Sequence, residues 1–190
     1  NVSPIPADHS QNLTGIWPKK VVNYKTVMSD AASGFTSVTY PFPVIRMADL
    51  YLMYAEALNE KGEDYATVLP WIDMVRERSG LQGVKESWDQ YVGNSKYATQ
   101  TGLRQIIMQE RRIELAFEGH YFWDVRRWKT ATTELTQPLT GWKVRYGETD
   151  VDYYSENLVL VRDFTPKMYF WPIDIGELRK DPNLVQNYGW

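Results

Sequence analysis

The chain has 190 residues, which is the length of one typical domain and enough for a sizeable hydrophobic core. Its formal net charge of −3 gives no electrostatic support for nucleic-acid binding, and the absence of cysteine excludes disulfides and thiolate metal sites. No apolar run approaches the roughly 20 residues needed to span a membrane, while aromatic residues make up 14% of the chain, which indicates either a stacking surface or many aromatic core contacts.

Residues 1–43 are rich in Pro, Ser, Asn and Gly, which predicts an irregular lead-in with one extended piece over residues 21–28. Pro41 and Pro43 flank Phe42 and favour an extended chain directly before the first helix. The helical part of the chain is therefore expected to begin after residue 43.

The first helix is predicted over residues 46–61 and ends at Gly62. Apolar side chains cover more than half of its helical wheel and leave only a narrow polar stripe, formed by Asp49, Glu56 and Glu60. A helix this apolar is expected to be packed on several sides.

A second helix is predicted within residues 64–78. A proline inside a helix costs about 3 kcal/mol, so Pro70 requires either a kink or a later start near Leu69. Two helices joined by a short glycine-containing turn resemble one tetratricopeptide (TPR) unit, although no period of 34 residues follows. The polar and aromatic stretch at residues 82–101 is predicted to be a loop that interrupts the helices.

Large rings are concentrated in two stretches that are predicted to be irregular. Large aromatic side chains prefer burial, but loops carry function, so both interpretations stay open: the rings fold back onto the helices, or they stand exposed for stacking on a ligand such as a sugar ring. The loop at residues 82–101 carries Trp88, Tyr91 and Tyr97. The stretch at residues 131–157 carries Trp142, Tyr146, Tyr153 and Tyr154.

A third helix is predicted from residue 103 to a break near Gly119, with Thr101 as its N-cap. On the helical wheel, Glu110 and Glu114 fall in the middle of its apolar face, and Glu118 falls at the edge. Carboxylates are rarely buried unless they are paired, so this face is expected to meet cations from elsewhere in the chain. The apolar residues of the face are Leu103, Ile106, Ile107, Ile113 and Phe117.

The nearest cations in the sequence are Arg126 and Arg127, and Arg76 projects from the apolar face of the second helix. A buried arginine–glutamate network would fix how the helices dock, whereas Glu110 and Glu114 as a catalytic pair would make a glycosidase. The structural network is favoured, because arginine is abundant nearby and no glycine-rich, open surround would admit a substrate.

A short fourth helix is predicted over residues 121–130, with His120 at the junction as a helix-end hydrogen bonder and not as a ligand. Residues 158–161 and 168–171 are predicted to pair as a small hairpin. The acidic run at residues 150–152 lacks an EF-hand pattern, so no calcium site is expected there.

The chain resembles the C-terminal region of the SusD/RagB family. The motif that carries most of this resemblance is E-R-R-x-E-L-x-x-E-G followed by D-x-x-R-W, which stands at residues 110–119 and 124–128. Two further matches are L-M-Y-A-E-A with Gly62, and R-x-R-x-G-L at residues 76–81.

The fourth match is the tail, where the family pattern P-I-P-x-x-E and then N-P-N-L-x-Q-N-x-G corresponds to residues 172–189. The chain departs from this pattern at three positions, which are Asp174, Asp181 and Tyr188. The four motifs occur in the family's order and together cover residues 46–190.

The resemblance implies a mainly α fold with TPR-like helix pairs, long irregular loops and a small β-hairpin. Residues 1–190 are then expected to be a single domain, the C-terminal portion of a SusD-like protein. Its parts are an irregular lead-in at 1–43, a helical core at 44–130 that includes the loop at 82–101, and an irregular tail with the hairpin at 131–190.

The resemblance also implies a non-catalytic protein that binds glycans at the cell surface and delivers them to a SusC-type TonB-dependent transporter. Such a protein is a lipoprotein of the outer membrane, and its signal peptide and lipidated cysteine would lie in an N-terminal half outside this chain. No cofactor, metal or nucleic acid is expected. The alternatives are a peptide-binding RagB-like member and a helical-repeat scaffold that binds only protein.

The resemblance and the composition together divide the singled-out residues into two groups. The ligand-binding candidates are the loop aromatics, which would stack on the ligand: Trp88, Tyr91, Tyr97, Trp142, Tyr146, Tyr153 and Tyr154. The charged motif residues are expected to be determinants of the fold: Arg76, Glu110, Arg111, Glu114, Glu118, Asp124, Arg126 and Arg127.

Overall fold

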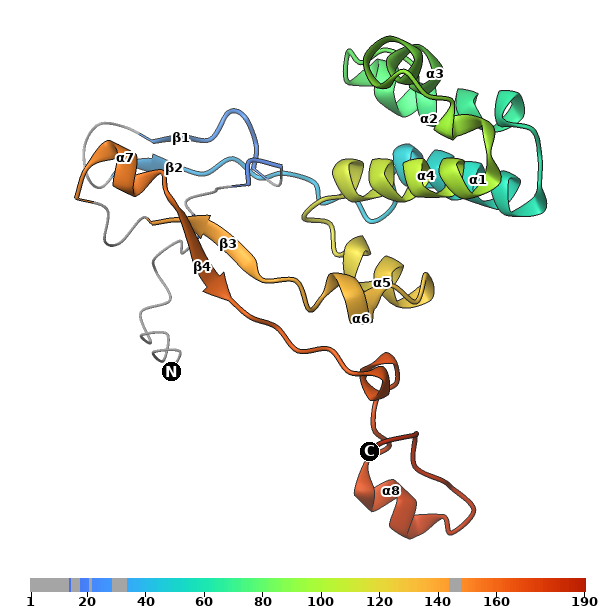
Figure 1. Cartoon of the computed structure of the whole chain (residues 1–190). Coiled ribbons are helices and arrows are strands. Elements are labelled where there is room, and N and C mark those ends of the chain that lie inside the picture. The colour runs from blue at the N-terminus through green and yellow to red at the C-terminus, as the bar shows by residue number, and fades with distance from the viewer. Residues whose placement is uncertain (1–13, 15–17, 21, 29–33, 144–147) are drawn as a thin grey trace. The chain divides into compact units, whose positions relative to one another are not determined.

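The chain divides into two units, which we name the helical unit, Lys20–Tyr121, and the tail unit, Phe122–Trp190 with Asn1–Lys19 (Figure 1). The secondary structure is mainly helical with short antiparallel strand pairs, so the predicted fold class is confirmed. The assignment of the whole chain to one domain stays a prediction. This computed structural model describes residues 14, 18–20, 22–28, 34–143 and 148–190.

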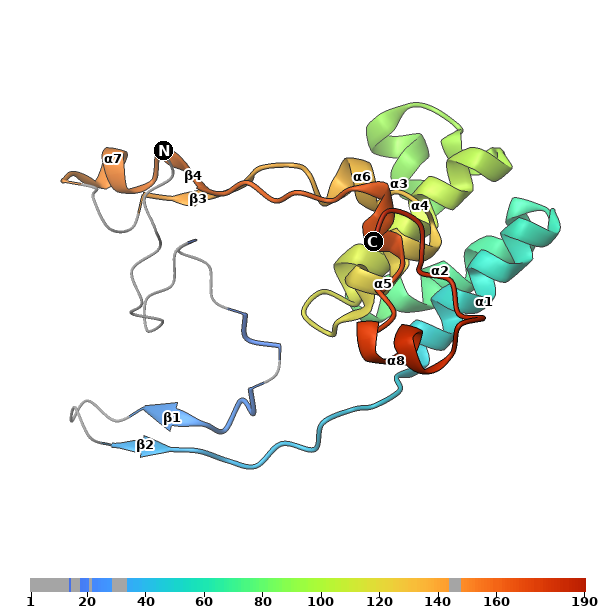
Figure 2. The same cartoon turned by 90° about the horizontal axis from the view of Figure 1, so that it is seen from below.

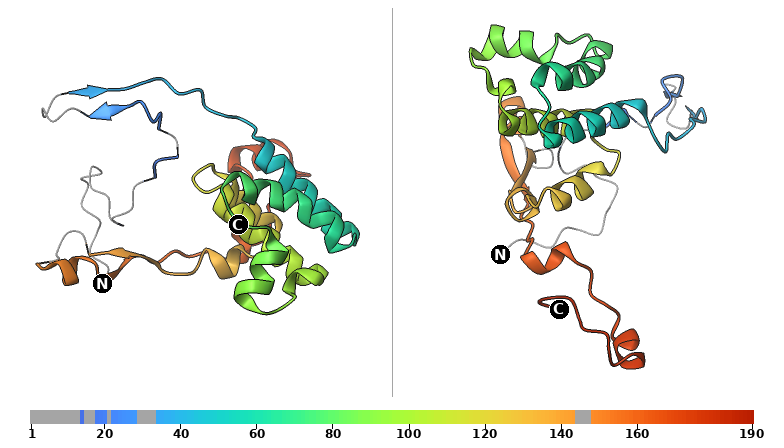
Figure 3. Two further views of the ribbon diagram at one scale, coloured as in Figure 1. Left: turned by 90° about the horizontal axis from the view of Figure 1, so that it is seen from above. Right: turned by 90° about the vertical axis from the view of Figure 1, so that its right-hand side faces the viewer.

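Three helices form the core of the helical unit: α1 (Met47–Lys61), α2 (Tyr65–Arg78) and α4 (Gln100–Glu114) (Figures 1 and 3). α1 packs against both of the others, as its apolar wheel predicted. The core is made of apolar side chains at helical spacing, of which the largest fully buried ones are Leu52, Val68, Ile72, Leu103 and Ile107.

A tight turn joins α1 to α2. Gly62 adopts a left-handed conformation with φ of +89°, which glycine reaches at no steric cost, and its N–H closes the last turn of α1 on the carbonyl oxygens of Leu58 and Asn59. Asp64 then caps α2, because its Oδ1 accepts a hydrogen bond from the N–H of Ala66 at 3.0 Å. The predicted end of the first helix is therefore confirmed.

α2 continues through Pro70 and begins at Tyr65, so the alternative start near Leu69 is wrong. The missing N–H and the clash of the proline ring cost about 3 kcal/mol. Val68 and Ile72 are fully buried on either side of the proline, and burial of each such side chain contributes about 1.5–3 kcal/mol. The packing of α2 thus offsets the cost of its proline.

Residues 82–101 form helical turns and not the predicted irregular loop: α3 (Val84–Ser87), a π-helical turn η1 (Trp88–Val92) and a 3-10 turn η2 (Lys96–Ala98). The N–H of Val84 donates to Asp73 Oδ1 at 2.7 Å, which anchors the start of α3. Val84 is fully buried and Trp88 packs against the core. These two residues, spaced i and i+4, hold the turns in place despite their polar neighbours.

Both ends of α4 differ from the prediction. Thr99, not Thr101, is the N-cap, and its Oγ1 accepts from the N–H of Gly102 at 3.1 Å. The helix ends at Glu114, and the turn after it contains two residues with positive φ, Phe117 at +65° and Gly119 at +84°. Ile113 lies in the last turn of α4 and Phe117 beyond its end, and both are exposed and do not belong to the buried face.

The lead-in contains a short antiparallel ribbon of β1 (Val27–Met28) and β2 (Phe35–Thr36). The tail unit starts within α5 (His120–Arg127) and continues through α6 (Ala131–Glu134). A small core of Val125, Ala131 and Phe164 holds this part together.

A hairpin of β3 (Leu139–Trp142) and β4 (Glu156–Leu160) follows, with α7 (Asp150–Tyr153) at its turn end (Figure 2). The sequence predicts a small hairpin in which residues 158–161 pair with residues 168–171. Residues 158–160 do lie in a strand, β4, but that strand pairs with the upstream β3 and not with residues 168–171. Met168 lies in a 3-10 turn, η3 (Pro166–Tyr169), which begins at a proline that cannot donate to a strand ladder.

The tail ends with α8 (Ile175–Lys180). Asp174 caps this helix, since its Oδ1 accepts from the N–H of Gly176 at 2.7 Å. The departure from the family's second proline thus serves a local purpose. Among the helices of the described residues, none combines the length and the apolar character that crossing a membrane requires.

Candidate functional site

The carboxylates of Glu114 and Glu118 are held by cations from outside their own segment. Arg46 donates from Nη1 to Glu114 at 2.7 Å, and from Nε and Nη2 to the two oxygens of Glu118 at 2.8 and 2.7 Å. Arg78 Nη2 lies 2.8 Å from both carboxylate oxygens of Glu114, and Lys20 pairs with Glu118. We call these five residues the helix-end network.

The same cations reach the backbone at the C-terminus of α4. Arg46 Nη2 donates to the carbonyl oxygen of Glu114 at 3.0 Å, and Lys20 Nζ donates to that of Ala116 at 3.0 Å. The last carbonyl groups of a helix lack partners within the helix and carry partial negative charge. The network therefore stabilises the end of α4 as well as its side chains.

Two further arginines fix the packing of the three helices. Arg76 pairs with Glu110 and also donates to Ser87 Oγ at 3.1 Å, so it ties α2 to α4 and to α3. Arg111 is buried and donates to Asp49 Oδ1 at 2.9 Å, which links α4 to α1. A buried charge needs such a partner, because desolvation otherwise costs several kcal/mol.

The two arginines that lie nearest in the sequence have other contacts in the tail unit. Arg127 Nε donates to Asp124 Oδ1 at 2.8 Å within α5. The guanidinium carbon of Arg126 lies 3.5 Å from the centre of the Phe122 ring. The cations that hold the acidic face of α4 come instead from the lead-in, from α2 and from the residue that precedes α1, so proximity along the chain was the wrong guide.

Within the helix-end network, the electrostatics favour the charged forms of Glu118 and Arg46. Burial raises the pKa of Glu118, but the hydrogen bonds from Arg46 and Lys20 outweigh this effect, and the pKa lies below its ordinary value. The pKa of Arg46 is raised, chiefly by its hydrogen bond to Glu118. Carboxylates engaged in this way suit a docking role, whereas a general acid needs a carboxyl group that exchanges its proton.

The lowered pKa of Glu118 makes the stability of the chain depend on pH. A group whose pKa is lowered by folding contributes stability above its unfolded pKa, near 4.3 for glutamate, and this is lost as the pH falls through the folded pKa. We expect Glu118→Gln to cost about 1–2 kcal/mol at pH 7 and much less at pH 3. Urea unfolding at both values measures this, and a cost that does not change with pH would contradict it.

The three rings predicted in the helical unit have different surroundings. Tyr91 is 73% exposed, whereas Trp88 packs partly against the core, with Lys96 Nζ 5.5 Å from its ring centre. Tyr97 is only 5% exposed, and its hydroxyl donates to Asp89 Oδ1 at 2.8 Å. That hydrogen bond raises the pKa of Tyr97. Of these three, Tyr91 alone offers a broadly exposed ring.

Three of the rings predicted in the tail unit lie at the β3–β4 hairpin. Trp142 and Tyr154 meet edge to face at 5.2 Å, and Tyr153 and Tyr154 do so at 5.0 Å. Trp142 is 40% exposed, and Tyr154 is more exposed still. In an edge-to-face pair the edge of one ring lies against the face of the other. We call these three residues the hairpin rings; Tyr146, predicted to join them, lies outside the described residues.

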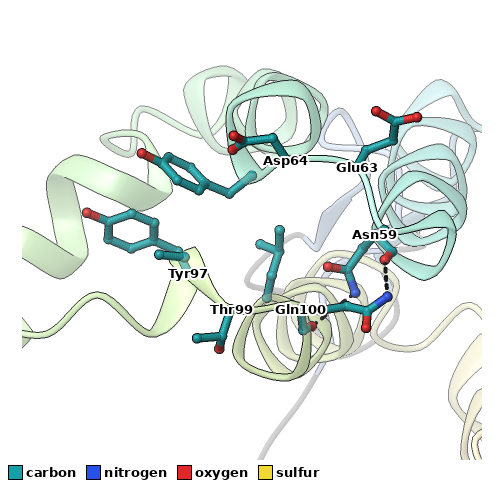
Figure 4. A pocket seen from close by; sticks show the side chains of 10 residues that line it. Asn59, Glu63, Asp64, Tyr97, Thr99 and Gln100 are labelled. Atoms are coloured by element: carbon teal, nitrogen blue, oxygen red, sulfur yellow. Dashed lines mark hydrogen bonds between the residues drawn. The ribbon is translucent and has the colours of Figure 1, made fainter.

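A polar pocket of about 490 Å³ lies where the α1–α2 turn meets the start of α4 (Figure 4). Asn59 is 1% exposed, and its Nδ2 donates to the carbonyl oxygen of Gln100 at 3.1 Å. Gln100 Nε2 returns a hydrogen bond to the carbonyl oxygen of Asn59 at 2.7 Å. This reciprocal pair holds two chain segments together at one wall of the pocket. The side chains labelled in Figure 4 are Asn59, Glu63, Asp64, Tyr97, Thr99 and Gln100.

Sequence reasoning missed most residues of this pocket and several of the network. Arg46 is the first residue of the helix predicted over residues 46–61, and that position was the available signal. Asp49 was recognised as part of a polar stripe but not as a partner of Arg111. No local sequence pattern marks Asn59 and Gln100 as partners, because their hydrogen bonds join segments that are distant in the sequence.

The fold and these surfaces define a class: a mainly helical protein with a TPR-like helix pair, a charged network at the end of α4 and partly exposed aromatic rings. The model of the SusD family matches residues 1–190, and the chain belongs to this family. A SusD-like protein of Formosa agariphila is 39% identical over 144 residues, which cover 76% of this chain and 23% of that relative. The chain therefore spans about a quarter of the length of the relatives it matches.

Solved structures support the same relationship. A SusD-like protein from Bacteroides fragilis is 30% identical, with a TM-score of 0.64 over 81% of this chain and 28% of that one. A second protein from the same organism, described as a SusD-like carbohydrate-binding protein, is 31% identical, with a TM-score of 0.59 over 76% of this chain and 28% of that one.

Proposed function

We propose that the full-length protein binds oligo- or polysaccharides at the cell surface and delivers them to a SusC-type TonB-dependent transporter. Family membership supports this, as does the neighbour described as carbohydrate-binding. Members of the SusD family are generally non-catalytic binding proteins, and we propose the same for this chain. Its place would be the outer membrane, held through a lipid anchor outside residues 1–190.

The observation that best supports glycan binding within this chain is the group of hairpin rings. Sugar rings present flat patches of C–H groups that stack on exposed aromatic faces. Trp142 and Tyr154 are large, exposed and fixed by their mutual contact. The main chain supports this surface as well, since the N–H of Lys143 donates to the carbonyl oxygen of Tyr153 at 3.0 Å. The rings are therefore organised before a ligand arrives.

Replacing the hairpin rings is expected to weaken glycan binding. We expect the double variant Trp142→Ala and Tyr154→Ala to lower affinity at least tenfold, because each stacked ring contributes about 1 kcal/mol or more. Affinity electrophoresis of the full-length protein in gels containing the bound polysaccharide measures this effect.

The matched control is Trp171→Ala, which removes an equally large, exposed ring elsewhere in the tail unit. Its affinity is expected to equal that of the wild type. Equal losses in the two variants, or none in the double variant, would remove the hairpin rings from the site. Binding of peptides in place of glycans would favour a RagB-like role.

A further inference from the structure

We propose that the polar pocket between the α1–α2 turn and the start of α4 is a second saccharide site that takes a neutral, hydroxyl-rich sugar unit. It shares no residue with the hairpin rings. Its volume of about 490 Å³ falls in the range of small-molecule sites, which is roughly 300–1,000 Å³. The inference goes beyond the proposed function, which it does not need in order to be true.

The first support comes from the side-chain oxygen of Asn59. Its Nδ2 faces two acceptors, the carbonyl oxygen of Gln100 at 3.1 Å and Glu60 Oε1 at 3.4 Å, so the orientation of the amide is fixed by chemistry. Oδ1 therefore points the other way, into the pocket, as Figure 4 shows. Among the described residues, none donates a hydrogen bond to this oxygen, although Asn59 is 1% exposed.

Asn59 Oδ1 is not one of the fully buried side-chain atoms without a partner, so it is open to the pocket, where a hydroxyl group of a ligand can donate to it. The second support is the carboxylate of Asp64 at the rim. One of its oxygens, Oδ1, accepts the capping hydrogen bond from Ala66, which leaves Oδ2 for a ligand. Asn59 and Asp64 thus both line the pocket, and each offers an oxygen that accepts a hydrogen bond from a donor on the ligand.

The third support is an aromatic wall. Tyr65 and Tyr97 both line the pocket and meet edge to face, with ring centres 5.4 Å apart. Tyr97 is fixed by its hydrogen bond to Asp89 and by Lys85, whose Nζ lies 5.8 Å from its ring centre. Tyr97 is only 5% exposed, so the partly exposed ring of Tyr65 supplies the apolar contact, and its place beside hydrogen-bond acceptors matches a sugar, which has C–H faces and a rim of hydroxyl groups.

The charge of the pocket selects among sugars. Of the described residues that line it, Glu63 and Asp64 are acidic and none is arginine or lysine; Glu63 is paired with Lys61 at 2.6 Å, so Asp64 contributes the larger part of the negative charge. A uronate or a sulfated sugar would bring a second negative charge beside them, so it should bind less well than a neutral sugar. A metal ion is a poorer match, because the described residues contain no group of three or more His, Cys, Asp or Glu side chains able to hold one.

The test is a titration of the 15N-labelled chain, followed by amide chemical shifts, with the methyl glycosides of glucose, galactose, mannose and xylose and with methyl glucuronide. We expect at least one neutral glycoside to shift the amides of Asn59, Tyr65 and Tyr97 with a millimolar Kd, and the glucuronide to bind at least fivefold more weakly. The same shifts should persist in Trp142→Ala, which separates this site from the hairpin rings.

Two variants sharpen the result. Asp64→Asn keeps a capping oxygen for α2 but removes the negative charge. It should therefore narrow the difference in affinity between the neutral glycoside and the glucuronide. Ala98→Trp fills the pocket from an exposed lining position and should abolish the shifts, whereas Ala98→Ser should not. The proposal is overturned if no neutral glycoside shifts these amides, if the glucuronide binds equally well, or if binding survives Ala98→Trp.

Discussion

Ile107→Ala is expected to destabilise the helical unit by about 3–5 kcal/mol. Ile107 is 0% exposed and lies in the centre of the core formed by α1, α2 and α4. Truncation of a buried isoleucine loses the transfer free energy of its methyl and methylene groups and leaves a cavity that the packed helices close only in part. Unfolding in urea, followed by the helical circular-dichroism signal, measures this loss.

The control comes from the same helix and uses the same substitution. Ile113 is 62% exposed, so Ile113→Ala should change stability by less than about 1 kcal/mol. The sequence predicts equal burial for the two residues because they share one face of the helical wheel. Similar losses in both variants would show that Ile113 is buried as Ile107 is, which contradicts the packing described for α4.

Arg46→Ala is expected to cost about 2–4 kcal/mol. Arg46 makes three hydrogen bonds to the carboxylates of Glu114 and Glu118 and one to a carbonyl at the end of α4. Breaking a buried pair costs about 3–5 kcal/mol, but Arg46 is partly accessible, and Arg78 and Lys20 remain beside the carboxylates. The expected loss is therefore smaller than for a fully buried arginine.

Arg104→Ala provides the comparison, since Arg104 also makes a bidentate pair with a glutamate, Glu60, at 2.6 Å for both hydrogen bonds. Both partners are exposed, and exposed pairs contribute about 0–1 kcal/mol. Thermal unfolding of the two variants should rank Arg46 well above Arg104. The reverse order would mean that the helix-end network does not fix the docking of α1 and α4.

Local signals in the sequence carried much of the fold. Gly62 and Asp64 mark the α1–α2 turn through backbone and capping preferences that depend only on neighbouring residues, and the structure uses both. The choice of Thr99 over Thr101 as a cap depends on how the 3-10 turn approaches α4. A side chain at Gly102 would meet the carbonyl oxygen of Lys96 there, so the position of this turn determines the cap.

Long-range pairing is what the sequence left unresolved. The hairpin partner of β4 lies upstream at Leu139–Trp142, across a connection that no turn motif identifies. Arg46 and Glu114 meet because two helices pack side by side, which spacing along one helix does not reveal. Of the seven ring residues predicted to bind the ligand, Tyr97 is buried, and its hydroxyl group donates a hydrogen bond to Asp89. The composition of the chain does not reveal such a contact.

The most direct test of glycan binding is a screen of the full-length protein that contains this chain against plant, host and microbial polysaccharides and a matched set of peptides. Retardation in affinity electrophoresis, with a parallel change in tryptophan fluorescence, reports binding. We expect at least one glycan to bind and the peptides not to bind. Binding of peptides alone, or of neither class, would contradict a role in glycan capture and favour a peptide-binding or protein-scaffold function.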